Sequence, residues 1–226
     1  MMRRLTWLFV CLAGCSSSAE PAPHNPASGA NVYYLNFEGG SLVAGSDNPT
    51  TNTSQLLNAS VTLPAYLAAD PQRAVKIQAI VDEVRAALAP YDISVVVSRP
   101  TSGTYDMVVA GGTSQQAGLG TGLPAATVVD CVGALLRHIT LLFDLSTGHE
   151  AARQIIGSLG VSHGISASIS AGDCMCIADS DCDPLTVACV ISGANTPVSA
   201  NADCEAGGAT TMDVDQKFRN AFGAHP

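Results

Sequence analysis

Apolar and polar residues alternate along residues 31–40, which is the pattern of a β-strand with both faces partly covered. Four further apolar runs, two of them rich in β-branched residues, predict additional strands at 92–98, 105–112, 125–130 and 138–145. The stretch 41–60 is polar and rich in turn residues, so we expect it to form an excursion outside the core.

Two segments have helical periodicity. Between Asp70 and Pro90 apolar residues recur every three or four positions, and Asp70-Pro71 supplies an N-cap and a first-turn proline. A second helix is predicted from Thr147 to Gly160, because Thr147 and Glu150 have the spacing of a capping box. Its expected buried stripe consists of Ala151, Ala152, Ile155, Ile156 and Leu159. About five strands and a long helix predict an α/β or α+β sandwich.

The N-terminal residues 1–14 combine two arginines, an apolar run and small residues, which is typical of a secretory signal peptide. The segment Leu12-Ala13-Gly14-Cys15 resembles a bacterial lipobox, which implies cleavage before Cys15 and attachment of lipid to its thiol. Residues 15–28 are rich in Ser, Pro and Ala and predict a flexible tether. Residues 29–226 are then a single domain. We expect lipid to be its only membrane attachment, and Ser16 after Cys15 favours the outer membrane.

Charge and cysteine content narrow the class of partner and the environment. Without residues 1–14 the chain keeps 8 Lys and Arg against 19 Asp and Glu, a net charge of −11, which argues against nucleic acid as a partner. An even number of cysteines in an exported chain predicts three disulfides and a loop-rich part at 161–226. Which cysteine pairs with which stays open. Zinc ligation by these thiols is the alternative. The six residues are Cys131, Cys174, Cys176, Cys182, Cys189 and Cys204.

The second helix ends in Gly160, with His163 three residues later and "GDCM" at 172–175. These residues resemble the metzincin zinc metallopeptidases, whose signature is H-E-x-x-H-x-x-G-x-x-H followed by a methionine turn beneath the metal. The resemblance implies a metzincin-like sandwich of a mixed twisted sheet with a long helix over 29–160, followed by a Cys-rich part. It also makes Met175 the residue of the methionine turn. A bridge from Cys131 to Cys174 is the long-range pairing we expect, since it would anchor that turn to the sheet.

The zinc motif is degenerate in this register. Its first ligand position holds Arg153, its general-base position Gln154 and its second ligand position Gly157. A guanidinium is a permanent cation without a lone pair, glycine has no side chain, and an amide cannot take a proton from water. We therefore expect no catalytic residue, no bound metal and no cofactor. The triple change Arg153→His, Gln154→Glu and Gly157→His is expected to create zinc affinity.

These residues predict a lipid-anchored pseudoprotease that acts as a binding or interaction module for an unidentified protein or peptide. Its cleft would lie along His149, Arg153 and Gly157, away from the buried stripe. One alternative is an active zinc metallopeptidase with a rearranged site around His163. That site requires two further imidazoles or carboxylates to converge on His163, from His149, from His138 or from the acidic loop at 179–183. A second alternative is an unrelated α/β lipoprotein.

Overall fold

The computed structural model describes residues 31–131, 137–177, 182, 186–197, 204 and 211–225. Its centre is a five-stranded sheet with the order β5-β1-β6-β8-β7. Four of these strands run parallel, and only β7 pairs antiparallel, with β8. The strands are β1 (Asn31–Asn36), β5 (Ile93–Val96), β6 (Asp106–Ala110), β7 (Ala125–Ala126) and β8 (Ile139–Leu142). The expected mixed sheet is therefore present.

The stretch 41–60 does not lie outside the core, contrary to expectation. It contributes to a second, three-stranded sheet with the order β3-β2-β4. Leu42 and Leu63 of this sheet, and Leu57 from the connection between two of its strands, pack against one face of the central sheet. Its strands are β2 (Gly40–Ala44), β3 (Thr53–Ser54) and β4 (Val61–Leu63). Strands β3 and β4, of two and three residues, are too short to produce a recognisable alternation, which explains why the pattern did not reveal them.

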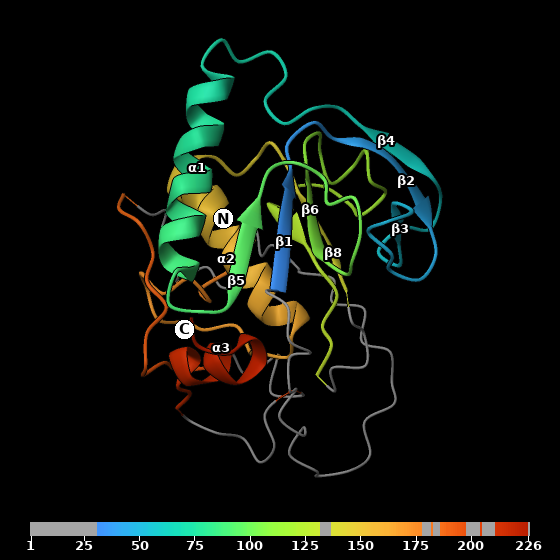
Figure 1. Cartoon of the computed structure of the whole chain (residues 1–226). Coiled ribbons are helices and arrows are strands. Elements are labelled where there is room, and N and C mark those ends of the chain that lie inside the picture. The colour runs from blue at the N-terminus through green and yellow to red at the C-terminus, as the bar shows by residue number, and fades with distance from the viewer. Residues whose placement is uncertain are drawn as a thin grey trace.

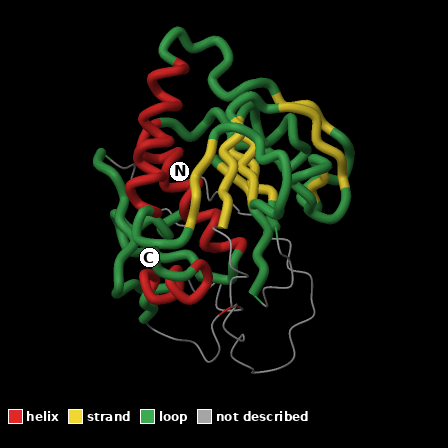
Figure 2. Tube along the Cα trace, viewed as in Figure 1, coloured by secondary structure: helices red, strands yellow, loops and turns green. Residues whose placement is uncertain are grey.

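Helices cover the opposite face of the central sheet (Figures 1 and 2). The described residues form three: α1 (Arg73–Leu88), α2 (Gly148–Ser162) and α3 (Val214–Phe222). The first two lie where helical periodicity predicts helices, but α1 begins at Arg73 with Gln72 as its N-cap residue, so the expected cap by Asp70 is wrong, and α3 was missed. The end of α3 lies beside the starts of β1 and β5, where the Asn31 amide donates to the Phe222 carbonyl and the Asp92 N–H donates to the Gly223 carbonyl. None of the helices in these residues is long and apolar enough to cross a membrane.

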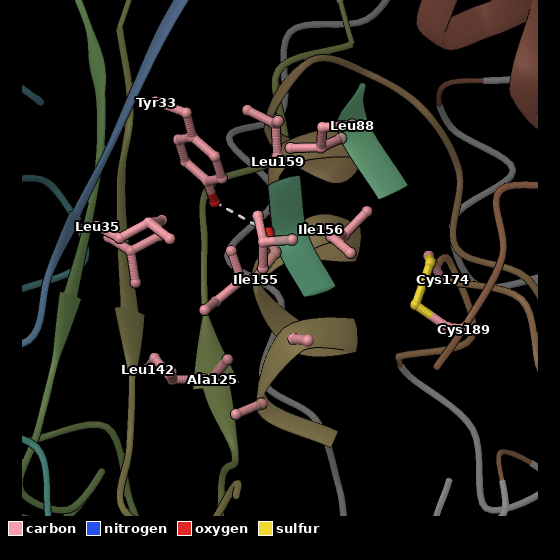
Figure 3. Packing of buried hydrophobic residues seen from close by; sticks show 14 of the residues in the cluster. Tyr33, Leu35, Leu88, Ala125, Leu142, Ile155, Ile156, Leu159, Cys174 and Cys189 are labelled. Atoms are coloured by element: carbon pink, nitrogen blue, oxygen red, sulfur yellow. Dashed lines mark hydrogen bonds between the residues drawn. A yellow bond between two sulfur atoms is a disulfide. The ribbon is translucent and has the colours of Figure 1, made fainter. Parts of the chain in front are cut away.

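The main core lies between the central sheet and α2. Ile155 and Leu159 of α2 lie on the side of the helix that faces Leu35 and Leu142 of the sheet (Figure 3). The Tyr33 hydroxyl donates a 2.9 Å hydrogen bond to the Ile155 carbonyl, which ties the helix to β1. Burial and the charge of Asp106 raise the pKa of Tyr33, so this hydroxyl remains a donor at neutral pH.

A disulfide-linked segment lies on the far side of α2. Three disulfides are present, as expected, and they join Cys131 to Cys204, Cys174 to Cys189 and Cys176 to Cys182. The expected bridge from Cys131 to Cys174 is wrong, because Cys174 pairs locally, 15 residues along the chain. Residues 1–30, which hold the predicted signal peptide, Cys15 and the tether, lie outside the described residues.

Candidate functional site

The helix face that matches the zinc signature is closed by its own side chains. Arg153 is 3% exposed, and its guanidinium forms an ion pair with Glu150 one turn earlier. The Gln154 amide donates a 2.8 Å hydrogen bond to the other carboxylate oxygen of Glu150. The same guanidinium reaches the Cys182 carbonyl at 3.5 Å. Glu150 is thus occupied by the two side chains that stand at the ligand and base positions.

The next turn of this face has no room for a side chain. A Cβ atom at Gly157 would lie 2.4 Å from Ile177 Cγ2 and 2.7 Å from the Cys174 carbonyl oxygen. At Gly160 a Cβ atom would lie 2.6 Å from Met175 Sδ. The glycines therefore let the Cys174–Ile177 segment approach the helix closely. Among the described residues, Arg153 and Gly157 line no open cleft, which corrects the expectation that this face lines one.

Two further expectations for α2 are wrong. Thr147 is the N-cap residue, but its side chain makes no capping hydrogen bond, and Glu150 binds side chains instead of closing a capping box. The triple change to a zinc motif also loses its basis, because a histidine at Gly157 would collide with the Cys174 backbone, which Cys189 holds by a disulfide.

The helix ends two residues later than expected, and this places His163 at its C-cap. Gly164 has φ of +78°, its N–H donates to the Val161 carbonyl, and the Ile165 N–H donates to the Gly160 carbonyl. This is the Schellman arrangement, in which a left-handed glycine follows the cap residue. It directs the His163 ring to the edge of the central sheet where β6 and β8 begin.

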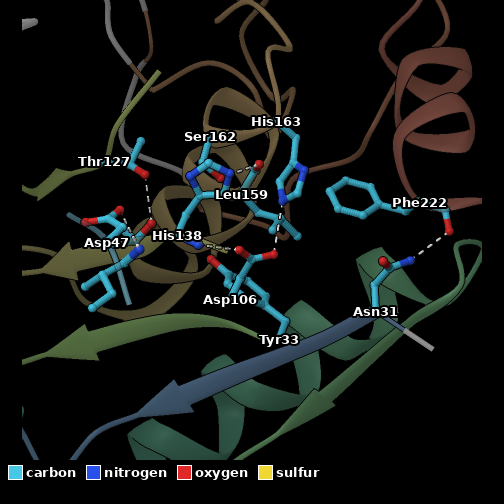
Figure 4. Close-up of polar contacts among 12 residues, drawn as sticks. Asn31, Tyr33, Asp47, Asp106, Thr127, His138, Leu159, Ser162, His163 and Phe222 are labelled. Carbon is cyan, nitrogen blue, oxygen red and sulfur yellow. Dashed lines mark hydrogen bonds and ion pairs between the residues drawn. The ribbon is translucent and has the colours of Figure 1, made fainter. Parts of the chain in front are cut away.

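His163 meets two side chains from that edge (Figure 4). Asp106 is the first residue of β6, and its Oδ2 lies 3.0 Å from His163 Nε2. His138 directly precedes β8, and its backbone N–H donates a 2.7 Å hydrogen bond to Asp106 Oδ1. One ligand atom from each of the three residues lies within 4.8 Å of the others. Phe222 of α3 contacts the His163 ring, with 4.6 Å between ring centroids.

His138 is the most buried member of this cluster. It is 2% exposed, and neither ring nitrogen has a hydrogen-bond partner among the described residues. Burial lowers the pKa of His138 to about 4, an effect that the charge of His163 adds to and the charges of Asp106 and Asp130 oppose. At neutral pH this imidazole is therefore neutral and keeps a free lone pair.

The cluster differs from the sets of residues considered from sequence. His163 and His138 come together, but His149 does not join them, because its Nδ1 pairs with Glu83 at 2.6 Å. Asp179, Asp181 and Asp183 of the acidic loop lie outside the described residues. Asp106 was not singled out. The available signal was its position directly before a buried strand, which His138 shares, since parallel strands begin at one edge.

A separate recess lies at the carboxyl end of β1, beside α1. It has a volume of about 320 Å³, and its lining includes Asn36, Phe37, Arg73, Ile77 and Arg85. The crevice outside the carboxyl ends of parallel strands is a frequent ligand position in α/β folds. The arginines there are held by neighbouring carbonyl groups: Arg73 donates to the Phe37 carbonyl at 2.7 Å, and Arg85 donates to the Val95 carbonyl.

Comparison with known proteins gives no relative. A scan against protein-family models, a search of curated proteins and a search of solved structures each found no match for this chain. Only the geometry of the molecule therefore bears on its function.

Proposed function

We propose that this chain is an exported, lipid-anchored protein with a metalloprotease-like fold that lacks peptidase activity and acts as a binding or interaction module. The lipid would be carried by Cys15 and would hold the domain at the outer membrane through the tether at 15–28. Its partner would be a protein or peptide rather than nucleic acid, in keeping with the net negative charge.

The observation that carries this proposal is the closed face of α2. A catalytic zinc site requires protein ligands with lone pairs and an open position for water. Here Arg153 is buried in an ion pair with Glu150, and Gly157 lies against the Cys174 carbonyl. Among the described residues, a metal at this face would meet a fixed cation, a carboxylate that Arg153 and Gln154 already engage, and no space beside Gly157.

Two features support the metalloprotease-like assignment of the fold. The mixed sheet and the helix α1 precede α2 in the order that the resemblance implies. Met175 is fully buried and packs against Gly160, so a methionine lies against the helix at the glycine of the signature. Asp173 fixes this turn, since its Oδ1 accepts a 2.7 Å hydrogen bond from the Met175 N–H.

The recess between α1 and the carboxyl end of β1 is the binding surface that we assign to the module. Its volume of about 320 Å³ suits a side chain or a short peptide segment rather than a large ligand. Its lining mixes apolar groups such as Phe37 and Ile77 with polar groups such as Asn36.

A peptidase centred on His163 is the second candidate, because Asp106 and His138 converge on that residue. Hydrolysis there would need a general base in addition to three metal ligands. Asp106 would already be used as a ligand, so this candidate requires a further carboxylate or imidazole.

A peptidase assay separates the two candidates. The exported protein, purified with its lipid in detergent, is incubated with a fluorogenic peptide library in the presence of zinc, and we expect no cleavage above the buffer. Cleavage that is lost both on chelation and in His163→Asn protein would overturn the proposed function. The His149→Gln variant is the matched control, since His149 is on the same helix but outside the cluster.

A further inference from the structure

We propose that Asp106, His138 and His163 form a binding site for a transition-metal cation, with zinc as the cation that its donors fit best. The site lies at the edge of the central sheet where the parallel strands begin, not on the helix face that resembles the zinc signature. It goes beyond the proposed function, because it adds a metal to a protein that the helix motif alone predicts to be metal-free.

The distances are close to those of a metal site. Zinc bound at about 2.0–2.1 Å in tetrahedral geometry holds its ligand atoms about 3.3 Å apart. The Asp106 and His163 atoms are already 3.0 Å apart, and all three ligand atoms lie within 4.8 Å of one another. Metal binding at this cluster requires side-chain rotation to close the remaining gap.

The backbone positions of the three residues are fixed by different elements. Asp106 and His138 are neighbours because β6 and β8 pair in parallel, with Met107 opposite Ile139. His163 is held by the glycine-terminated end of α2. Ligands on paired strands and a helix end are more precisely placed than ligands on loops.

The environment of His138 is an independent indication. A buried imidazole normally satisfies its nitrogens, yet both nitrogens of His138 lack a hydrogen-bond partner among the residues that the structure describes. A metal ion would satisfy one of them. Figure 4 shows the ring beside Asp106 and near His163, whose ring meets it edge-on with 5.0 Å between the ring centroids.

The donor set and charge select the class of cation. Two imidazoles with one carboxylate suit zinc and related transition metals, whereas calcium and magnesium prefer oxygen-only sites. Burial penalises a positive charge at His138, and the charges of Asp106 and Asp130 offset part of that cost. The guanidinium of the adjacent Arg137 is directed to the Asn48 side chain, at 3.4 Å. The His163 side chain remains 22% exposed, which leaves a route for a water molecule as fourth ligand.

Metal binding is tested on the full exported protein in detergent after exhaustive chelation and buffer exchange. Titration with ZnCl₂ by calorimetry is expected to show one equivalent, while MgCl₂ and CaCl₂ show none. Zinc at a hundredfold excess over its Kd is expected to raise Tm by about 5–10 °C. In the variants Asp106→Asn and His163→Asn, zinc affinity should fall at least tenfold, and in the His149→Gln control it should be unchanged.

The outcomes separate this inference from the proposed function. Far-UV circular dichroism verifies the fold of each variant, and either folded variant alone decides the question. If the wild type binds no zinc, or if a folded cluster variant binds it as tightly as the wild type, the site is refuted whatever the peptidase result. If zinc binds at the cluster and the loaded protein cleaves peptides, the metal site stands and the proposed function fails. Zinc binding without cleavage supports both.

Discussion

Acid is expected to destabilise the metal-free protein through one buried side chain, His138. Its pKa is about 4 in the folded protein and about 6.5 in the unfolded chain, because burial disfavours the imidazolium. Between these values the unfolded chain binds the additional proton, so stability rises with pH. The neutral imidazole therefore contributes its full stability above pH 6.5, and this contribution is lost as the pH falls toward 4.

The size of the effect follows from the two pKa values. Each tenfold difference in proton affinity corresponds to about 1.4 kcal/mol, so lowering the pH from 7 to 4 should remove about 3 kcal/mol through His138 alone. The pKa difference can be converted into a free energy of unfolding because His138 is only 2% exposed, so solvent screens its charge little. Asp106, Asp130 and His163 act on the same ring, and their net influence is contained in the value of about 4.

The assay is urea unfolding at pH 7 and pH 4, with the disulfides intact and a chelator present. His138→Gln protein should lose about 3 kcal/mol less than the wild type between these pH values. His149→Gln protein, which changes a half-exposed histidine paired with Glu83, should behave like the wild type. An equal loss in wild-type and His138→Gln protein would show that burial of this imidazole does not control the acid response.

Three further results are expected. Gly157→Ala should lower the free energy of unfolding by about 1–2 kcal/mol, because overpacking against the Cys174 carbonyl outweighs the gain in helix propensity, and denaturant unfolding measures it. A rise in stability would contradict that contact. Asp213→Ala should lower the free energy of unfolding by about 1 kcal/mol in the same assay, because the Asp213 side chain accepts a hydrogen bond from the Gln216 N–H at the start of α3. An unchanged unfolding midpoint would show that this cap does not stabilise the helix. Cys15→Ser should move the protein from the membrane to the soluble fraction, and retention in the membrane would refute lipidation.

Local patterns in the sequence predict the elements that are long and covered on one side. The alternation from residue 31 yields β1, and the three- to four-residue spacing yields α1 and α2. The helix α3 had comparable signals that were overlooked. Val214, Phe218 and Phe222 are spaced four apart and all buried, and Asp213 precedes them as an N-cap.

The site depends on pairings that local patterns do not contain. Asp106 and His138 meet only because β6 and β8 are neighbours in the sheet, although 32 positions separate them. The disulfides pose the same problem, because six cysteines allow 15 pairings. The sequence of α2 alone also does not predict that the face with Arg153 and Gly157 is covered. Arg153 and Gly157 fall opposite the apolar stripe, and only the Cys-rich segment that covers them explains their burial.

That covering segment completes the core around α2, and two disulfides help to hold it there. Every residue of α2 from Ala151 to Ser162 is buried, yet the outer side of the helix is covered by a layer held through Cys174–Cys189 and Cys176–Cys182. In a reducing compartment the layer lacks these covalent links. The entropy of the unfolded chain then rises, which lowers the free energy of unfolding. Noncovalent packing, such as that of Met175 and Ile177, is then all that holds the layer against α2. The redox state of the surroundings thus sets how firmly the outer side of α2 is covered.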